Sequence, residues 1–383
     1  MRIAMVCGSY PPQPCGIGDY TERLVSELIR SGVDIEVITS ASPDRALQET
    51  IRFQLDNWSG GAWLRTVGEM KKRQYDIVHF QYPARFYGYR PSLGSLSLIL
   101  RMRLPSVPIV LTLHEFRITH FLRKLTVAAI AAPASAILLT ADSERVALER
   151  WMPWLRKKVH VVNMATTIPV IPLSSERRTE LRSRYGVKPE EKLVVYFGLL
   201  HPNKGIEKLM RTFQLLHARN PSTKLLMLSL FEPFSNQYHA GIRTGVASLG
   251  IEEAVIWAGF LPPADVSEHL ASADAGIFPF EDGVTLRRLS FMTAMSHGLP
   301  VLTTVGHAGS EDLGLRHGEN VLLVDAADSP DRMAAALDEL FSSEEMMVRL
   351  SAGARTWSSG FQWGSVVTAT KDIYTTIVAG ISK

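Results

Sequence analysis

Short apolar runs alternate with amphipathic helical stretches along almost the entire chain of 383 residues. This alternation is typical of β-α-β units, in which parallel strands are buried between helices. The first unit is the clearest, with an apolar run at residues 3–6, a loop rich in glycine and proline at 8–18 and a helical stretch at 20–30. Asp19 followed by Glu22 is typical of a capping pair at the start of that helix. The pattern therefore predicts an α/β fold with parallel sheets.

The alternation occurs in two series. Apolar strands are expected at residues 3–6, 35–38, 77–80, 109–113, 136–139 and 159–162, and again at 193–197, 225–230, 255–257, 275–278, 301–304 and 321–324. Between the series, residues 169–192 contain closely spaced prolines, which favour extended backbone, and then a polar helix at 174–185. A helix at 364–381 has no strand after it. We therefore predict two Rossmann-like domains, at residues 1–170 and 188–362, followed by a separate helical segment at 363–383.

The composition is that of a soluble globular protein, with 46% hydrophobic and 21% charged residues. A net charge of +3 is too small to indicate a nucleic-acid partner, and no run of basic residues is interleaved with aromatic ones. Two cysteines, Cys7 and Cys15, are too few for a disulfide framework. The N-terminus lacks the apolar core of a signal peptide, and the longest apolar stretch contains Pro133 and is too short to span a bilayer. We expect a cytoplasmic protein.

Basic residues gather in one part of the first series, where they alternate with apolar residues. They are Arg85, Arg90, Arg101, Arg103, Arg117, Arg123 and Lys124. The pattern fits the solvated faces of two helices, and it also fits a surface that rests on anionic lipid. The second interpretation predicts peripheral contact with the inner face of the cell membrane.

The loop after the first strand contains Gly16 and Gly18. Glycines let the backbone approach a ligand closely, and ligands of open parallel sheets bind beyond the carboxyl ends of the strands. The Gly-x-Gly pair lacks the third glycine of the dinucleotide fingerprint. The loop is therefore either part of a phosphate site or a structural turn.

The loop at residues 198–205 runs from Gly198 to a lysine, Lys204, at the expected start of the next helix. A cation is unfavourable there because the helix dipole is already positive at that end. An anion held between Lys204 and backbone N–H groups would explain the lysine. The alternative is a solvated surface lysine.

A third loop, at residues 278–288, joins an expected strand to a helix that ends near His297. It gathers two acids, a glycine, a threonine and two adjacent arginines, and the members of interest are Asp282, Gly283, Thr285, Arg287 and Arg288. Arginine presents fork-like donors that suit phosphate oxygens. Adjacent residues point in different directions, so we expect one arginine of the pair to reach the ligand.

His114 and Glu115 follow directly after the expected strand at residues 109–113. A histidine at the carboxyl end of a parallel strand lies near the ligand edge of the sheet. A lone histidine can equally be a satisfied structural residue, so both interpretations stay open. The chain has no Walker loop, nucleophile elbow, H-E-x-x-H motif, His/Cys cluster at metal spacing or Asp-x-Asp motif. We predict no metal and no cofactor.

Taken together, these loops resemble those of the retaining glycosyltransferases of family four, also called group one, which have the GT-B fold. The resemblance covers nearly the whole chain. It rests on Tyr-Pro-Pro…Gly-Ile-Gly-Asp-Tyr-Thr, Asp76-Ile-Val-His-Phe-Gln, Leu-Thr-Leu-His-Glu, Phe-Gly-Leu-Leu-His-Pro-Asn-Lys-Gly, Trp257-Ala-Gly-Phe-Leu-Pro, Ala273-Asp274-Ala-Gly-Ile-Phe-Pro and Ala294-Met-Ser-His-Gly-Leu-Pro-Val. Each piece alone is unspecific, whereas the combination in this order is specific.

The resemblance implies two Rossmann-like domains facing each other across a cleft. It implies a donor nucleotide on the second domain, an acceptor on the first, and a last helix that packs back on the first. Lys204 matches the family lysine that grips the donor diphosphate, and His114 matches the histidine beside the transferred sugar. Gly16 and Gly18 match the glycine loop near the donor phosphates. Glu115 is expected to contact substrate.

The sequence also departs from the family pattern. Where the family usually has an arginine after Gly198, this chain has Leu199. Where it has two glutamates eight residues apart, this chain has Thr285 and Thr293, of which the second could hold the ribose only weakly. The chain resembles a variant branch with Asp-Gly-x-Thr-x-Arg-Arg in this loop. Our hypothesis is that Arg287 or Arg288 replaces the missing cation at position 199.

The resemblance implies transfer of a glycosyl group from a nucleoside diphosphate sugar to an acceptor hydroxyl, with retention and without a metal. We expect the acceptor to be a saccharide or lipid-linked sugar in the synthesis of a bacterial surface polysaccharide or glycolipid. One rival is a GT-B nucleotide-sugar epimerase, which would need no acceptor. A second is a catalytically inactive protein that binds sugar nucleotides as a scaffold, which the missing glutamates would explain.

Overall fold

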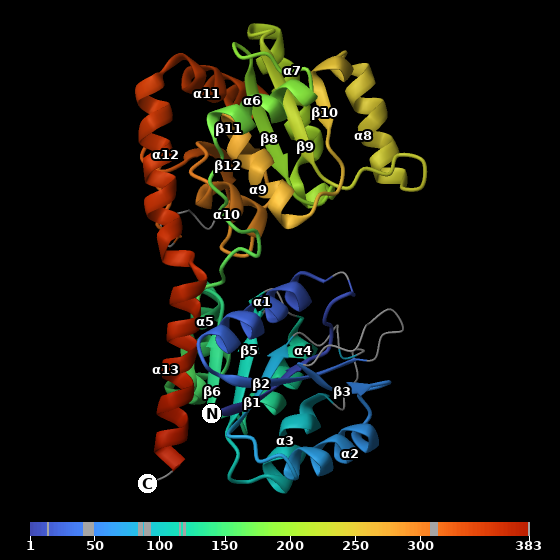
Figure 1. The fold of residues 1–383 in the computed structure, drawn as a ribbon, viewed down its shortest axis with the longest axis vertical. Coiled ribbons are helices and arrows are strands. Elements are labelled where there is room, and N and C mark those ends of the chain that lie inside the picture. The colour runs from blue at the N-terminus through green and yellow to red at the C-terminus, as the bar shows by residue number, and fades with distance from the viewer. Residues whose placement is uncertain are drawn as a thin grey trace. The chain divides into compact units, whose positions relative to one another are not determined.

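A computed structural model describes residues 1–13, 15–40, 50–82, 87, 93–114, 116–117, 120–306 and 313–381. The chain divides into two compact units, one of Met1–Thr167 with Phe361–Lys383 and the other of Ile168–Gly360. Each unit contains a parallel sheet flanked by helices (Figure 1). The prediction of two Rossmann-like α/β domains is therefore confirmed.

The described part of the first unit has a 7-stranded sheet in the order β3-β2-β1-β4-β5-β6-β7. All its neighbouring strands pair in parallel. The strands are β1 Arg2–Cys7, β2 Asp34–Ser40, β3 Ile51–Leu55, β4 Ile77–Tyr82, β5 Ile109–Leu113, β6 Ala136–Leu139 and β7 Val159–Val161. Strands β4, β5 and β6 are buried along their whole length, which is why they read as largely apolar runs, interrupted by His79 and Gln81 in β4 and by Thr112 in β5.

The helices of this unit are α1 Gly16–Arg30, α2 Gly60–Lys71, α3 Leu93–Arg103, α4 Phe121–Ala131, α5 Asp142–Trp151 and α13 Trp363–Ile381, with a 3-10 helix, η2, at Pro153–Lys158. The last of them, α13, packs against α1, although the whole second unit separates the two in sequence. The Lys371 ammonium donates to the Ser31 carbonyl at the end of α1 over 2.8 Å. Helix α13 therefore belongs to the first unit, although it follows the second unit in sequence.

The second unit has, among its described residues, a 6-stranded parallel sheet in the order β10-β9-β8-β11-β12-β13. The strands are β8 Lys192–Phe197, β9 Thr223–Leu228, β10 Val255–Trp257, β11 Ala275–Phe278, β12 Val301–Val305 and β13 Leu322–Asp325. The helices are α6 Ser175–Arg184, α7 Ile206–Arg219, α8 Gln237–Ser248, α9 Pro263–Ser272, α10 Leu289–Ser296, α11 Pro330–Ser342 and α12 Glu344–Ser358, with 3-10 helices η3 Pro202–Lys204, η4 Glu252–Ala254 and η6 Ser359–Phe361 at or between them.

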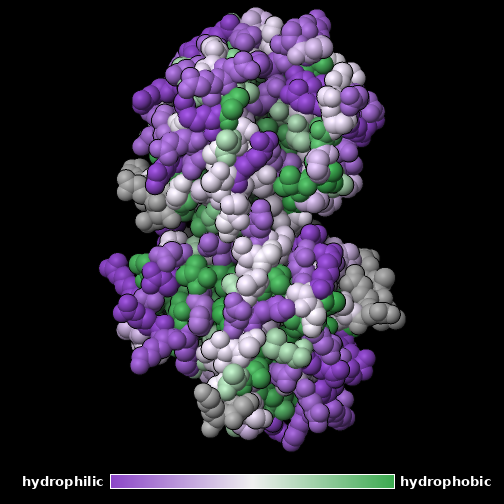
Figure 2. All heavy atoms as spheres, turned by 60° about the vertical axis from the view of Figure 1, so that its left-hand side comes forward, coloured by the Kyte–Doolittle hydropathy of each residue, from purple (hydrophilic) through white to green (hydrophobic). Residues whose placement is uncertain are grey.

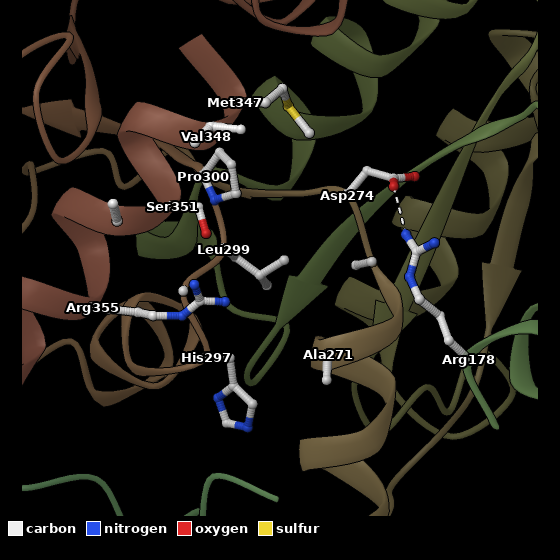
Figure 3. A pocket seen from close by; sticks show the side chains of 13 residues that line it. Arg178, Ala271, Asp274, His297, Leu299, Pro300, Met347, Val348, Ser351 and Arg355 are labelled. Atoms are coloured by element: carbon white, nitrogen blue, oxygen red, sulfur yellow. Dashed lines mark hydrogen bonds and ion pairs between the residues drawn. The ribbon is translucent and has the colours of Figure 1, made fainter. Parts of the chain in front are cut away.

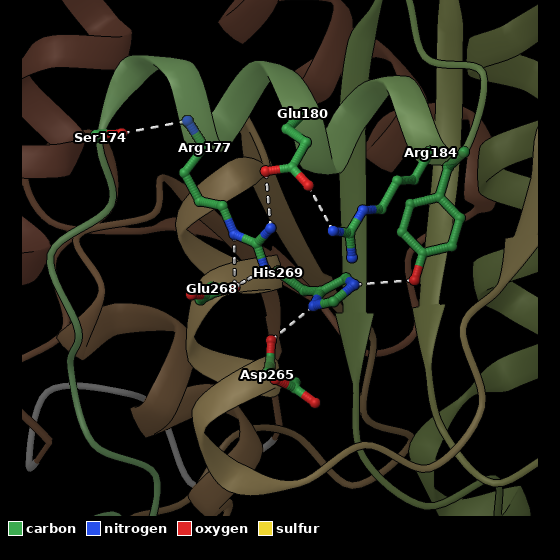
Figure 4. Close-up of polar contacts among 8 residues, drawn as sticks. Ser174, Arg177, Glu180, Arg184, Asp265, Glu268 and His269 are labelled. Atoms are coloured by element: carbon green, nitrogen blue, oxygen red, sulfur yellow. Dashed lines mark hydrogen bonds and ion pairs between the residues drawn. The ribbon is translucent and has the colours of Figure 1, made fainter.

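The polar helix of the segment between the two series, α6, is built into the second unit. Arg177 donates to Glu268 on α9 over 2.8 Å (Figure 4). The buried Arg182 guanidinium lies 3.0 Å from Asp274. The hydroxyl of Tyr185 lies 2.9 Å from His269, also on α9. These contacts explain why a charged helix, weak by itself, is held on the sheet rather than left as a flexible linker.

Two local predictions were wrong. Helix α1 begins at Gly16, because the Cys15 side chain caps it by accepting from the Gly18 N–H over 3.4 Å. Asp19 therefore lies in the first turn and does not cap the helix. Strand β3 was not expected, because its apolar residues alternate with Arg52 and Gln54 as befits an edge strand with one exposed side.

The order of each sheet reverses at one place, between β1 and β4 in the first unit and between β8 and β11 in the second. Strand connections leave in opposite directions there, which opens a crevice beyond the carboxyl ends of the two strands. In the first unit the segment after β1 and the end of β4 lie at this place, and in the second unit the segments after β8 and β11 do.

Candidate active site

The segments after β8 and β11 in the second unit approach each other so closely that side chains do not fit between them. A Cβ on Gly205, which has φ of +68°, would lie 1.9 Å from the Pro279 carbonyl oxygen. In the same way, the segment after β11 lies against the end of β12, because a Cβ on Gly283, with φ of +83°, would lie 2.2 Å from the Gly306 nitrogen. Glycine is thus required at both places by backbone conformation and by space. The loop at 198–205 is thereby held against the loop at 278–288.

Lys204 and Arg288 converge on one aromatic ring in this contact. The Lys204 Nζ lies 5.2 Å from the centre of the Phe280 ring, and the Arg288 Cζ lies 4.5 Å from it. Phe280 is fully buried, so it forms an apolar base for both cations. Asp282 pairs with Arg288 and is the counter-charge of this cluster. Two cations side by side at a sheet switch point form an arrangement suited to a polyanion.

Burial and the neighbouring Arg288 lower the pKa of Lys204 to about 8, and Asp282 opposes this shift only in part. The lysine therefore lacks sufficient negative charge around it in the unit as described. A phosphate group placed beside it would restore its usual pKa by favouring the charged form.

The remaining predicted donor residues of this unit lie in or next to the same loop. Gly198 follows β8 and lies against Ser290, the second residue of α10. The Thr285 hydroxyl accepts from the Arg287 N–H over 3.4 Å. The Thr293 hydroxyl is buried and donates to the Leu289 carbonyl, one turn back in its own helix, over 2.7 Å. The ribose contact of Thr293 stays a prediction.

In the first unit, His114 follows β5 and lies next to the end of β4. Its Nε2 lies 2.8 Å from the Gln81 Oε1, and its ring meets the Tyr20 ring edge-on with centres 5.5 Å apart. His114 is only 3% exposed, and burial lowers its pKa to about 4. The histidine is therefore neutral at physiological pH and is a hydrogen-bonding group rather than a cation.

The glycines predicted for a phosphate loop lie in the first turn of α1 instead. A Cβ on Gly18 would approach the Ser9 carbonyl oxygen to 3.1 Å, whereas a Cβ on Gly16 would meet nothing within 4 Å. Gly18 thus allows the segment after β1 to fold tightly on the helix. Gly16 has no such packing contact among the described residues, and its place near the donor phosphates stays a prediction.

Glu115, the other predicted catalytic residue, lies outside the described residues, as do Arg85 and Arg90. The backbone that follows Glu115 is held by a different carboxylate. The buried Glu144 on α5 accepts from the N–H groups of Phe116 and Arg117 over 2.8 and 2.7 Å. This contact anchors the segment immediately after His114.

A pocket of about 430 Å³ also lies in the second unit (Figure 3). Its lining includes Asp274, which precedes β11, and Leu299 and Pro300, which precede β12. It therefore opens at the amino ends of these strands, away from Lys204. In the described ranges no three His, Cys, Asp or Glu side chains gather as metal ligands, and no helix is both long and apolar enough to cross a bilayer.

Comparisons with known proteins agree with this architecture. Residues 15–198 match the glycosyl transferase 4-like domain, and residues 191–343 match the glycosyl transferases group 1. Between them, the two models account for both units. The chain belongs to the group 1 glycosyltransferases. It is therefore a glycosyltransferase with the GT-B fold.

Relatives of this glycosyltransferase share its length but little of its sequence. The D-inositol 3-phosphate glycosyltransferase of Corynebacterium glutamicum is 22% identical, over 99% of this chain and 97% of that one. Sucrose-phosphate synthase from Thermosynechococcus elongatus superimposes with a TM-score of 0.76 at 18% identity, over 99% of this chain and 100% of that one. Anabaena HepE, solved with UDP and glucose, superimposes with a TM-score of 0.77 at 17% identity, over 98% and 100%.

Several residues at these sites were not singled out from the sequence. Phe280 lies within the loop at residues 278–288 but was given no role, and Gln81 lies in a motif that supported only the family resemblance. The signal for Gln81 was present, because His79 and Gln81 are polar residues two apart in an otherwise apolar buried strand. Such residues need partners, and at the carboxyl end of a strand those partners are near the site.

Proposed function

We propose that this enzyme transfers a sugar from a nucleoside diphosphate sugar to an acceptor hydroxyl, with Lys204 and Arg288 binding the diphosphate. The observation that carries the proposal is the convergence of both cations on Phe280, at the point where the order of the second sheet reverses. Ligands of such sheets bind at this point. The similarity to HepE, which was solved with UDP and glucose, supports the same donor class.

The two cations would act on the leaving group. As the glycosidic bond breaks, the diphosphate gains negative charge, and cations already fixed in place stabilise that charge without reorganising. Arg288 supplies the second cation because position 199 holds an exposed leucine. Its present partner, Asp282, is 66% exposed and can release it to a diphosphate. Thr285 and Gly283 shape the same loop, so their role is to present these groups.

His114 is proposed to contact the transferred sugar, with Glu115 beside it. A neutral imidazole has one N–H donor and one nitrogen acceptor, so it can form hydrogen bonds with sugar hydroxyls without carrying a charge. Retention of configuration is proposed from the family resemblance. No metal is assigned a part, since the cations of the chain can meet the diphosphate charge themselves.

A transfer assay separates this proposal from its two rivals. The enzyme is incubated with UDP-, GDP- and ADP-sugars and a panel of saccharide and lipid-linked acceptors, and both products are quantified. We expect release of the nucleoside diphosphate to match formation of a glycoside, and Arg288→Met to raise the donor KM at least about tenfold, as loss of one charge-assisted contact implies. An isomerised donor without acceptor would identify an epimerase. Tight donor binding with no product would identify an inactive scaffold.

The acceptor is proposed to be lipid-linked, at an anionic membrane. Large apolar side chains are exposed along α3, α4, α5 and η2, namely Leu98, Met102, Phe121, Leu122, Leu125, Trp151 and Trp154. Exposed Arg101, Arg103, Arg123 and Arg156 lie among them in sequence. The Lys124 Nζ lies 4.2 Å from the Trp151 ring and so joins α4 to α5. We call this set the basic-apolar face. Figure 2 shows hydrophobic and hydrophilic side chains mixed over one side of this unit.

This mixture suits the boundary between lipid headgroups and acyl chains. It would place the enzyme beside a glycolipid or a lipid-linked surface polysaccharide.

The test is sedimentation with vesicles of phosphatidylglycerol or phosphatidylcholine. We expect binding to the anionic vesicles only, weakened by Leu125→Ser. The control is Val348→Ser in the second unit, because the two side chains are 66% and 64% exposed. Equal binding to both vesicles, or no binding, would contradict the proposal.

A further inference from the structure

A chain of buried polar side chains joins His114 to the last helix of the protein. The His114 Nε2 lies 2.8 Å from the Gln81 Oε1, and the Gln81 Nε2 lies 3.4 Å from the His79 Nε2. The His79 Nδ1 lies 2.5 Å from the hydroxyl of Tyr374 on α13. All four side chains are at most 3% exposed. The chain crosses β5, β4 and α13, three elements that share no local sequence.

The chemistry of these atoms assigns the protons. The Gln81 amide nitrogen lies 3.5 Å from the Met5 sulfur, which can only accept, so this nitrogen is the donor toward His79. The His79 Nε2 is then an acceptor, which the Thr112 hydroxyl also meets at 2.7 Å, and its proton lies on Nδ1, facing Tyr374. The Gln81 oxygen can only accept, so His114 carries its proton on Nε2.

A second route joins His114 to the same helix through aromatic rings. The Tyr20 ring meets His114 on one side and lies 5.1 Å from the Trp363 ring on the other, measured between centres. Trp363 begins α13 and donates to the Thr166 carbonyl over 2.7 Å, which fixes its ring. Helix α13 therefore supports His114 by a hydrogen-bonded route from its middle and by a route of aromatic ring contacts from its start.

We propose that α13 sets the tautomer and orientation of His114, with Gln81, His79 and Tyr374 as positioning residues. The proposal rests on the proposed function only in its assignment of His114 to the sugar. The arrangement leaves the His114 Nδ1 as an acceptor, and this atom is buried with no hydrogen-bond partner among the described residues. An acceptor held in this way suits a hydroxyl or amide N–H of the substrate, and it excludes a protonated, cationic histidine.

The direct test is ¹⁵N NMR of the imidazoles in the whole protein labelled at histidine, with His114→Gln to assign the signals. At pH 7 we expect His114 to be neutral, with the proton on Nε2. Gln81→Leu should convert it to a mixture of tautomers, and Tyr374→Phe should change the His79 signals. A single Nδ1-protonated tautomer in the wild type, or an unchanged tautomer in Gln81→Leu, would overturn the proposal. This readout needs no activity, so it stands apart from the proposed function.

Steady-state kinetics distinguish a positioning role of Gln81 and Tyr374 from an effect of these residues on stability alone. We expect Gln81→Leu to lower kcat about tenfold with little change in donor KM, because the misplaced group acts on the reacting sugar. Gln81→Glu, which keeps an acceptor oxygen, should recover part of the loss. Tyr374→Phe should have a smaller effect in the same direction. The matched control is Thr370→Val, which removes another buried hydroxyl from α13, one that bonds, among the described residues, to the Val366 carbonyl of the same helix. Equal losses in Tyr374→Phe and Thr370→Val would contradict a specific role for the chain of hydrogen bonds.

Discussion

At the scale of single residues, the surroundings of Lys204 determine how easily its ammonium group keeps its charge. Its ammonium is half-buried, rests on the Phe280 ring and has another cation, Arg288, as its neighbour. These surroundings disfavour the charged form before a ligand arrives. A bound diphosphate would favour it again, so donor binding and protonation of Lys204 should be linked.

The linkage has a definite sign. The pKa of Lys204 without donor is about 8, and a bound diphosphate raises it. Above pH 8 the enzyme must therefore take up a proton to bind, and donor affinity should fall as pH rises, by up to about tenfold per unit. Calorimetric titration with UDP at pH 7, 8 and 9 measures the effect. Lys204→Arg stays charged throughout and should flatten the profile. A flat wild-type profile would show that Lys204 does not face the diphosphate.

A second residue-scale prediction concerns acid stability. Burial lowers the pKa of His79 to about 3 and that of His114 to about 4, whereas both would titrate near 6.5 in the unfolded chain. The unfolded chain thus binds more protons below pH 6.5, so stability should decrease steadily as pH falls from 6.5 toward 4. Thermal unfolding across this range checks it. His79→Gln should lessen the slope, and an unchanged slope would contradict the assigned burial.

At the scale of elements, the contact between the loops after β8 and β11 is what brings Lys204 and Arg288 together. This contact depends on Gly205, whose replacement would drive a Cβ into the Pro279 carbonyl. Gly186 offers a matched comparison, because it has a nearly equal φ of +66° but nothing within 4 Å of a Cβ.

Alanine at the two positions should therefore differ in effect. Gly186→Ala should lower the free energy of unfolding by about 1 kcal/mol, the penalty of the left-handed conformation alone. Gly205→Ala should lower it by about 3 kcal/mol or more, because a clash is added to that penalty. Denaturant unfolding measures both. If the two losses were equal, the loops would not be in the contact described, and the shared site of Lys204 and Arg288 would be in doubt.

The elements also show how much of the fold could be predicted from the sequence. The alternation of apolar runs with helical stretches was enough for the two sheets, because buried parallel strands read as continuous apolar runs. The start of α1 was misplaced, since the sequence offers Asp19 as a cap and the fold uses Cys15. The link between His79 and Tyr374 spans 295 residues, and only the folded chain brings them together. Local patterns cannot predict such a contact.

At the scale of the whole molecule, each of the two similar units has one candidate site of its own. Each candidate site lies beyond the carboxyl ends of strands at the point where the sheet order reverses. Lys204 and Arg288 belong to the second unit, and His114 belongs to the first. The last helix, α13, belongs to the first unit as well, although it follows the second in sequence. Because both units have this fold, the chain contains two sheet edges of the kind at which ligands bind.

The most direct test of the central claim is a titration of the protein with nucleoside diphosphate sugars, followed by thermal unfolding. A donor at a hundred times its Kd should stabilise the folded state by about 2.7 kcal/mol. We predict that at least one donor raises the midpoint, that Lys204→Ala abolishes the rise, and that Lys224→Ala, at the amino end of β9, leaves it intact. No shift with any donor, or an equal shift in Lys204→Ala, would contradict a diphosphate site built on Lys204 and Arg288.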